Sequence, residues 1–168
     1  MILIITGPPA AGKSTIGPLL ARKLAHCAVA DVDQLRAMVV QPHIAPWLGD
    51  AGMAQLRLGA QNGCAVARNC VGGGFAVVPL DVLTDETAQI YRCELADLVP
   101  QIVLLLPSLT VALARNRARG QFLTDEEVTL LYGWQERLTS YDRRIDNSEI
   151  DAVVVAKQLY RYALEQRA

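Results

Sequence analysis

The feature that most constrains this chain is the segment GPPAAGKS at residues 7–14, directly after the apolar run ILIIT at residues 2–6. It has the full GxxxxGK[ST] spacing of a P-loop, a phosphate-binding turn between a buried strand and a helix. Lysine occurs elsewhere only at residues 23 and 157, so a lysine at this position is rarely accidental. The segment therefore predicts a phosphate-binding loop at the end of the first strand.

Each part of this loop has a physical role in holding a nucleotide such as ATP. Gly7 and Gly12 allow the backbone to point N–H groups inward, and the helix N-terminus favours negative charge. Lys13 reaches the β- and γ-phosphate oxygens, and the hydroxyl of Ser14 ligates Mg²⁺. We expect these loop residues to contact the nucleotide: Gly7, Pro8, Pro9, Ala10, Ala11, Gly12, Lys13, Ser14 and Thr15.

The rest of the chain alternates short apolar runs with longer helical segments. The runs lie at residues 2–6, 27–31, 75–80, 101–106 and, more weakly, 143–146. Runs that are apolar throughout predict strands buried on both faces, as in a parallel sheet covered by helices. Three- and four-residue spacing predicts helices over 53–67 and 152–163, and Ser108 and Thr124 are predicted N-caps. The alternation predicts one three-layer α/β/α domain over residues 1–168 with an open five-stranded sheet.

Composition narrows the class of protein further. The 168 residues are 52% hydrophobic and 20% charged with a net charge of −1, which predicts a packed core and no global positive field. A nucleic-acid partner is therefore not expected. No apolar run approaches the roughly 18 residues of a membrane span, so we expect no membrane association and a cytoplasmic protein. The four cysteines form no CxxC pair, which argues against a zinc or redox site.

Two aspartates end the second apolar run, in the sequence Asp31-Val32-Asp33. The carboxyl end of a strand beside the P-loop faces the crevice in which open α/β sheets bind ligands. We expect Asp31 to hold Mg²⁺ through water and Asp33 to accept a proton from, or orient, an attacking hydroxyl. The alternative is that Asp33 is the N-cap of the following helix, and the two roles are compatible.

A third aspartate, Asp81, ends the run FAVVPL at residues 75–80. This is the place of a Walker B type carboxylate, so Asp81 is a further candidate metal ligand, with a plain turn or helix-cap role as the alternative. The three glycines at 72–74 precede this strand and are interpreted as a helix stop. The irregular segment 41–52 is either a loop on the substrate side or an ordinary surface connection.

Arginines follow the fourth strand in ALARNRARG at residues 112–120. Arg115 and Arg119 share a helix face, and we expect them to clamp phosphate from a short lid at about residues 115–125, hinged at Gly120-Gln121. A solvated basic face is the alternative, and it applies more strongly to Arg117. After the last strand, Asn147 is predicted beside the nucleotide base. The expected catalytic residues are thus Lys13, Asp33, Arg115 and Arg119.

The order of these pieces resembles the small P-loop kinases of the shikimate kinase, gluconate kinase and chloramphenicol phosphotransferase group, over nearly the whole chain. GKSTIG at 12–17 and DVDQ at 31–34 are similar to the P-loop and Asp-x-Asp of shikimate kinase, which implies Asp31 near metal and Asp33 at the acceptor hydroxyl. The resemblance also implies the strand order 2-3-1-4-5.

The chain also departs from the shikimate kinase pattern. The triple glycine comes before the third strand instead of after it, and the FRxxE pattern is missing although Arg57 falls in about that region. The segment PLDVL at 79–83 is closer to the corresponding strand of chloramphenicol phosphotransferase. ALARNRARG and YDRRIDNS are similar to uncharacterised members of the group. The departures argue against shikimate as the substrate.

Together these observations predict an ATP-dependent, Mg²⁺-requiring phosphotransferase that acts on a hydroxyl of a small molecule, such as a metabolite or an antibiotic. One alternative is a nucleoside or polynucleotide 5′-hydroxyl kinase, for which aromatic residues, 5% of the chain, are scarce. The other is a nucleotide-binding switch with slow hydrolysis, which needs no acid at an acceptor pocket. The expected assembly is a monomer or a homodimer.

Overall fold

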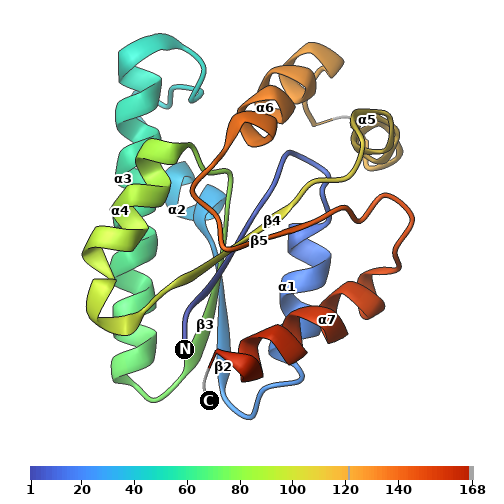
Figure 1. Cartoon of the computed structure of the whole chain (residues 1–168). Helices are drawn as coiled ribbons and strands as arrows, with labels where there is room; N and C mark the ends of the chain where they lie inside the picture. The colour runs from blue at the N-terminus through green and yellow to red at the C-terminus, as the bar shows by residue number, and fades with distance from the viewer. Residues whose placement is uncertain (121, 167–168) are drawn as a thin grey trace.

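A parallel five-stranded sheet in the order β2-β3-β1-β4-β5 forms the centre of the molecule (Figure 1). The structure is a computed structural model that describes residues 1–120 and 122–166. The strands are β1 (Leu3–Thr6), β2 (Cys27–Asp31), β3 (Ala76–Asp81), β4 (Gln101–Leu105) and β5 (Arg143–Ile145). The predicted three-layer fold, the parallel sheet and its strand order are confirmed.

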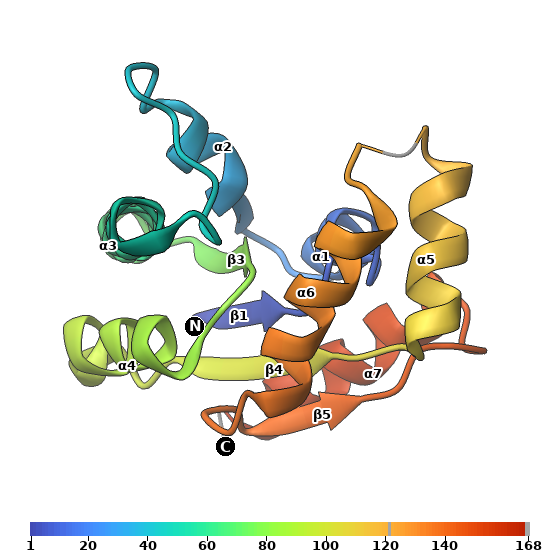
Figure 2. The same cartoon turned by 90° about the horizontal axis from the view of Figure 1, so that it is seen from above.

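Helices cover both faces of the sheet and its carboxyl end. They are α1 (Lys13–Ala21), α2 (Val32–Ala37), α3 (Gly49–Gly72), α4 (Asp85–Glu94), α5 (Leu109–Ala118), α6 (Asp125–Arg137) and α7 (Ala152–Glu165), with a 3₁₀ turn at Ala96–Leu98. Helices α1 and α7 lie against one face and α3 and α4 against the other, while α5 and α6 stand over the carboxyl ends of the strands (Figures 1 and 2).

The apolar pattern of β1 explains why both faces are covered. Leu3 and Ile5 pack into a cluster with α1 and α7, whereas Ile2 and Ile4 pack into a second cluster with α3 and α4. Each of these side chains is at most 1% exposed. Complete burial of an aliphatic side chain contributes about 1.5–3 kcal/mol, so the central strand stabilises both layers.

Side-chain caps begin both helices that stand over the carboxyl ends of the strands. Ser108 and Thr124 are the N-caps of α5 and α6, as predicted, and Thr124 forms a capping box with Glu127. Helix α3 ends at Gly72, within the predicted glycine stop. The irregular segment is shorter than predicted, because α3 already begins at Gly49. In residues 1–120 and 122–166, no helix combines the length and hydropathy that a membrane span requires.

Candidate active site

A cavity of about 460 Å³ opens where the carboxyl ends of β1, β2 and β3 meet. Its walls come from the P-loop, the ends of β2 and β3, the segment before α3, the end of α5 with the residues after it, and α6. Its volume is in the range of small-molecule sites, and its place is the one at which open α/β sheets bind ligands.

The P-loop backbone is shaped to receive an anion. Ala10 and Gly12 have positive φ angles of 60° and 96°, and the loop is closed by a hydrogen bond from Ala11 N to Pro8 O. Gly12 is the N-cap of α1, and no side chain caps the free N–H groups that begin this helix. Pro8 and Pro9 carry no N–H, so phosphate must be bound by the later residues of the loop.

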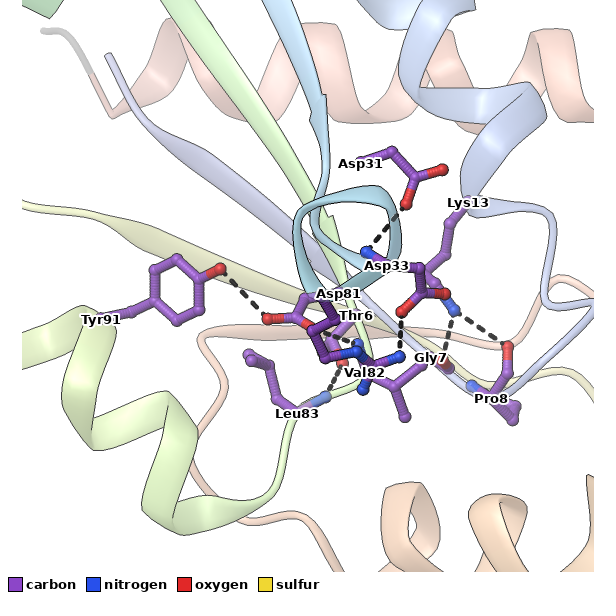
Figure 3. A network of polar contacts seen from close by, with 11 residues as sticks. Thr6, Gly7, Pro8, Lys13, Asp31, Asp33, Asp81, Val82, Leu83 and Tyr91 are labelled. Carbon is purple, nitrogen blue, oxygen red and sulfur yellow. Dashed lines mark hydrogen bonds and ion pairs between the residues drawn. The ribbon is translucent and has the colours of Figure 1, made fainter. Parts of the chain in front are cut away.

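The side chain of Lys13 lies against the backbone of its own loop. Its Nζ donates to Gly7 O at 2.6 Å and to Pro8 O at 3.1 Å (Figure 3). Burial of the ammonium lowers its pKa, and this is opposed by the carboxylates of Asp33, Asp81 and Asp31, in that order. The ammonium is therefore held beside the cavity by carbonyls that an incoming phosphate would replace as acceptors.

Asp31 and Asp33 both line the cavity, but they differ in their local roles. Asp31 is the N-cap of α2, since its Oδ1 accepts from Asp33 N at 3.1 Å. The alternative that Asp33 is this cap is therefore wrong, because Asp33 already lies in the first turn of the helix. Asp33 Oδ1 accepts from Arg36 at 2.5 Å, and its Oδ2 has no partner within the described residues.

Asp81 does not reach the cavity wall, although its neighbours Leu80 and Val82 do. The side chain is buried, with Oδ1 accepting from Val82 N at 2.8 Å and Oδ2 accepting from the Tyr91 hydroxyl at 3.1 Å. Burial is the main cause that raises the pKa of Asp81 to about 6; the charge of Asp33 acts in the same direction, and Arg36 acts against it. Its role as a metal ligand stays a prediction.

The structure separates the three arginines that were predicted together. Arg119 is exposed and lines the cavity. Arg115 instead donates to Asn147 O at 2.9 Å and Ser148 O at 3.3 Å, which holds the loop after β5. Arg117 forms an ion pair with Asp125. Gly120, with φ of 95°, fits the predicted hinge, whereas Gln121 lies outside the described residues.

Asn147 lies behind the P-loop and supports it. The side chain is 2% exposed, and its Nδ2 donates to Ala11 O at 2.8 Å. Its Oδ1 is buried without a hydrogen-bond partner in the part of the chain described here. A contact of Asn147 with the nucleotide base stays a prediction, while its contact with the loop backbone is direct.

Three cavity residues were not singled out from the sequence: Arg36, Asn116 and Trp134. Trp47 lies in the irregular segment 41–52, and its place in the cavity wall favours the alternative of a loop on the substrate side. The three-residue spacing of Asp33 and Arg36 could have predicted their ion pair on one helix face. The rarity of tryptophan could have marked Trp134 as a candidate site residue. Arg57, by contrast, forms an ion pair with Glu86 and does not line the cavity.

The oxygen atoms that line the cavity suit a Mg²⁺ ion bound to phosphate better than an ion held by protein groups alone. Among residues 1–120 and 122–166, no three His, Cys, Asp or Glu side chains gather into a metal cluster. Ser14 and Asp31 line the cavity together, and Asp31 Oδ2 has no partner among the described residues. Mg²⁺ usually keeps several waters and combines one or two carboxylates with substrate phosphates. Ser14 and Asp31 suit this kind of site.

Comparison with known proteins identifies the fold. No protein-family model matches the chain, and no curated protein matches it. Among solved structures, shikimate kinase from Acinetobacter baumannii in complex with shikimate has a TM-score of 0.70 at 14% identity, covering 98% of this chain and 93% of that one. The tunicamycin resistance protein of Deinococcus radiodurans has a TM-score of 0.68 at 20% identity, with 96% and 95% covered.

Shikimate kinase from Aquifex aeolicus is similar to the same degree. Its TM-score is 0.67 at 20% identity, and the match covers 99% of this chain and 98% of that one. Each of the three matches covers at least 96% of this chain. The chain therefore has the P-loop kinase-like fold of the shikimate kinases.

Proposed function

We propose that this protein is an ATP-dependent phosphotransferase that moves the γ-phosphate to a hydroxyl group of a small molecule, with Mg²⁺ as the required ion. The observation that carries this proposal is that Asp33 and the P-loop line the same cavity. Asp33 Oδ2 has no hydrogen-bond partner among the described residues. Of the charged groups near Lys13, the Asp33 carboxylate has the largest effect on the pKa of Lys13. The proposal is also supported by the two shikimate kinases among the solved structures with the same fold.

The residues have distinct tasks in such a transfer. The P-loop N–H groups and Lys13 bind the phosphates, and Ser14 with Asp31 would hold Mg²⁺, which neutralises charge on the phosphate oxygens. Asp33 orients the acceptor hydroxyl and takes its proton while the hydroxyl oxygen bonds to the γ-phosphorus. The bond from that phosphorus to the bridging oxygen breaks, and ADP is the leaving group. Arg119 stabilises charge on the moving phosphoryl group.

Acceptor-dependent transfer tests this proposal. ATP turnover is measured with and without a panel of hydroxylated metabolites and antibiotics, and mass spectrometry looks for products that have gained a phosphate. We expect turnover to be strongly stimulated by a productive acceptor. Asp33→Asn should lower the transfer rate by about 10²–10⁴-fold, the usual contribution of a general base.

The control is Asp31→Asn, which keeps a side-chain oxygen that can cap α2. Asp31→Asn tests the role of Asp31 in holding the metal. Raised Mg²⁺ should restore part of the activity that Asp31→Asn loses, and it should not restore the activity that Asp33→Asn loses. ATP turnover that no acceptor stimulates and that Asp33→Asn leaves unchanged would instead support a nucleotide-binding switch.

A further inference from the structure

The acceptor side of the cavity is built from the rarest side chains of the protein. The sequence has two tryptophans, and both Trp47 and Trp134 line this one cavity. Phe122, one of two phenylalanines, lines it from the lid. Because aromatic residues are 5% of the chain, their collection around one cavity is a specific feature of the fold. Aromatic rings supply large apolar contact area and stack on flat ligands.

The wall that carries Trp47 is held in place by α3. Gln55 accepts from Ile44 N at 3.0 Å through its Oε1 and donates to Pro42 O at 2.8 Å through its Nε2. Gly52 allows the segment to approach the helix, because a Cβ there would lie 2.1 Å from Ala45 O. The segment is thus held against α3 at residues 42–45, just before Trp47, and α3 itself begins two residues after Trp47.

The wall that carries Trp134 is anchored through the next residue, Gln135. Gln135 is fully buried, and its Oε1 accepts from the Thr6 hydroxyl at 2.8 Å. Its Nε2 donates to Leu83 O at 2.5 Å. These contacts tie α6 to the ends of β1 and β3, so the helix that carries Trp134 is a fixed wall of the cavity.

The two indole side chains are left available to a ligand. Both tryptophans are half-buried, and neither indole N–H donates to another residue in the part of the chain described. The segment before α3 and helix α6 lie on opposite sides of the carboxyl end of the sheet (Figures 1 and 2). A flat molecule between these walls would cover apolar ring area that is now open to the cavity.

The charges on this side of the cavity disfavour an anionic acceptor. Arg36 is the basic residue nearest to Asp33, and its guanidinium already donates to that carboxylate. Lys13 lies on the P-loop, and Arg119 lies at the end of α5, where phosphate is expected. A carboxylate on the acceptor would meet Asp33 at a place where the adjacent cation, Arg36, is already paired, and an uncompensated charge in a partly buried site is costly.

We infer that the acceptor is an uncharged alcohol with a flat apolar ring, bound with the ring between Trp47 and Trp134 and the hydroxyl at Asp33. This inference rests on the proposed phosphotransfer only for the fate of the hydroxyl. The binding geometry itself comes from the two tryptophans and from the neutralised Arg36.

Binding without ATP tests the inference separately from catalysis. The probes are phenylpropanol, the same alcohol with a carboxylate on its ring, and shikimate. Tryptophan fluorescence reports binding, because the protein has two tryptophans and both line this cavity. Trp134 also lines a second cavity beside Thr84 and Arg137, so the signal of Trp47 in Trp134→Leu assigns the binding to the acceptor side. We expect phenylpropanol to bind at least about tenfold more tightly than the two carboxylates, a difference of about 1.4 kcal/mol.

Substitutions assign the binding to the two walls. Trp47→Leu and Trp134→Leu should each weaken phenylpropanol binding by about tenfold, read from the remaining tryptophan, whereas Trp47→Phe should keep most of it. Phe75→Leu is the control, because Phe75 is exposed and packs edge-on against His26 away from the cavity. Asp33→Asn should strengthen binding of the ring carboxylate severalfold, because Arg36 then loses its partner.

The outcomes separate the two proposals. Absence of phenylpropanol binding, tighter binding of either carboxylate in the unmodified protein, or phenylpropanol affinity that both leucine variants leave unchanged would overturn the inference. A failure of phosphotransfer beside selective binding of phenylpropanol would overturn only the proposed function. Phosphotransfer to anionic acceptors alone would uphold the proposed function and overturn the inference.

Discussion

The hydroxyl of Tyr91 donates a 3.1 Å hydrogen bond to Oδ2 of Asp81, and both side chains are closed off from solvent. The pair links α4 to the end of β3, directly behind the cavity. Burial raises the pKa of Asp81 to about 6 and that of Tyr91 well above its usual value. A buried carboxylate at this position is therefore costly to the fold at neutral pH.

The pKa of Asp81 predicts how stability depends on pH. Because the folded-state pKa of about 6 exceeds the ordinary 3.8, the folded protein binds more protons between these values, and stability falls as pH rises through this window. The shift corresponds to a cost on the order of 3 kcal/mol above pH 6. Asp81→Asn should remove it and raise the melting temperature at neutral pH but not at about pH 4.

The control for this prediction is Asp97→Asn. The hydrogen bond from Arg68 lowers the pKa of Asp97, so its removal should give no gain at neutral pH. The measurement is the difference in melting temperature between each variant and the unmodified protein across pH. An Asp81→Asn difference that does not change with pH would contradict the assigned cause.

Lys13→Ala should abolish phosphotransfer with little change in the free energy of unfolding. Among the described residues, its hydrogen bonds go to two carbonyls of its own loop, so it contributes little to the core. Lys23→Ala, an exposed lysine just after α1, is the matched control and should leave both quantities unchanged. Transfer by Lys13→Ala within a factor of two of the unmodified rate would refute the role.

Arg119→Ala should lower the turnover number more than it weakens ATP binding, because charge on the moving phosphoryl group is greatest in the transition state. The expected loss is on the order of 10³-fold. Arg117→Ala is the control, since Arg117 is paired with Asp125, and it should have a small effect. Steady-state kinetics and nucleotide titration measure the two effects. A fall in ATP affinity with an unchanged turnover number would show that Arg119 only binds the nucleotide.

Arg115→Ala tests a different mechanism from the clamp that the sequence suggested. Arg115 holds the loop after β5 through the carbonyls of Asn147 and Ser148. Its loss should weaken ATP binding together with turnover, and Arg115→Lys should restore part of both. A fall in turnover at unchanged nucleotide affinity would instead favour the predicted clamp.

Gly63→Ala should destabilise the protein by about 1–3 kcal/mol, because overpacking a core forces neighbouring groups to move. A Cβ at Gly63 would lie 2.3 Å from the Tyr91 hydroxyl oxygen, and that hydroxyl is held by Asp81. Gly72→Ala, at the end of the same helix with open space around it, should be neutral or stabilising by up to about 1 kcal/mol. Denaturant unfolding compares the two, and equal effects would exclude a steric origin.

The sequence alone determined the elements and their order. The apolar runs, the capping residues Ser108 and Thr124, and the P-loop spacing are local signals, since each depends on residues close together in the chain. Even the position of Asp31 and Asp33 at the cavity follows from their place at the end of a strand beside the P-loop.

The tertiary structure decided which side chains meet across long separations. The placement of α4 beside the end of β3 brings Tyr91 to Asp81, and the loop after β5 binds Arg115 and so separates it from Arg119. Trp47 and Trp134 are far apart in the chain, and the fold brings both to one cavity. Such contacts depend on the relative positions of whole elements, which no local spacing in the sequence encodes.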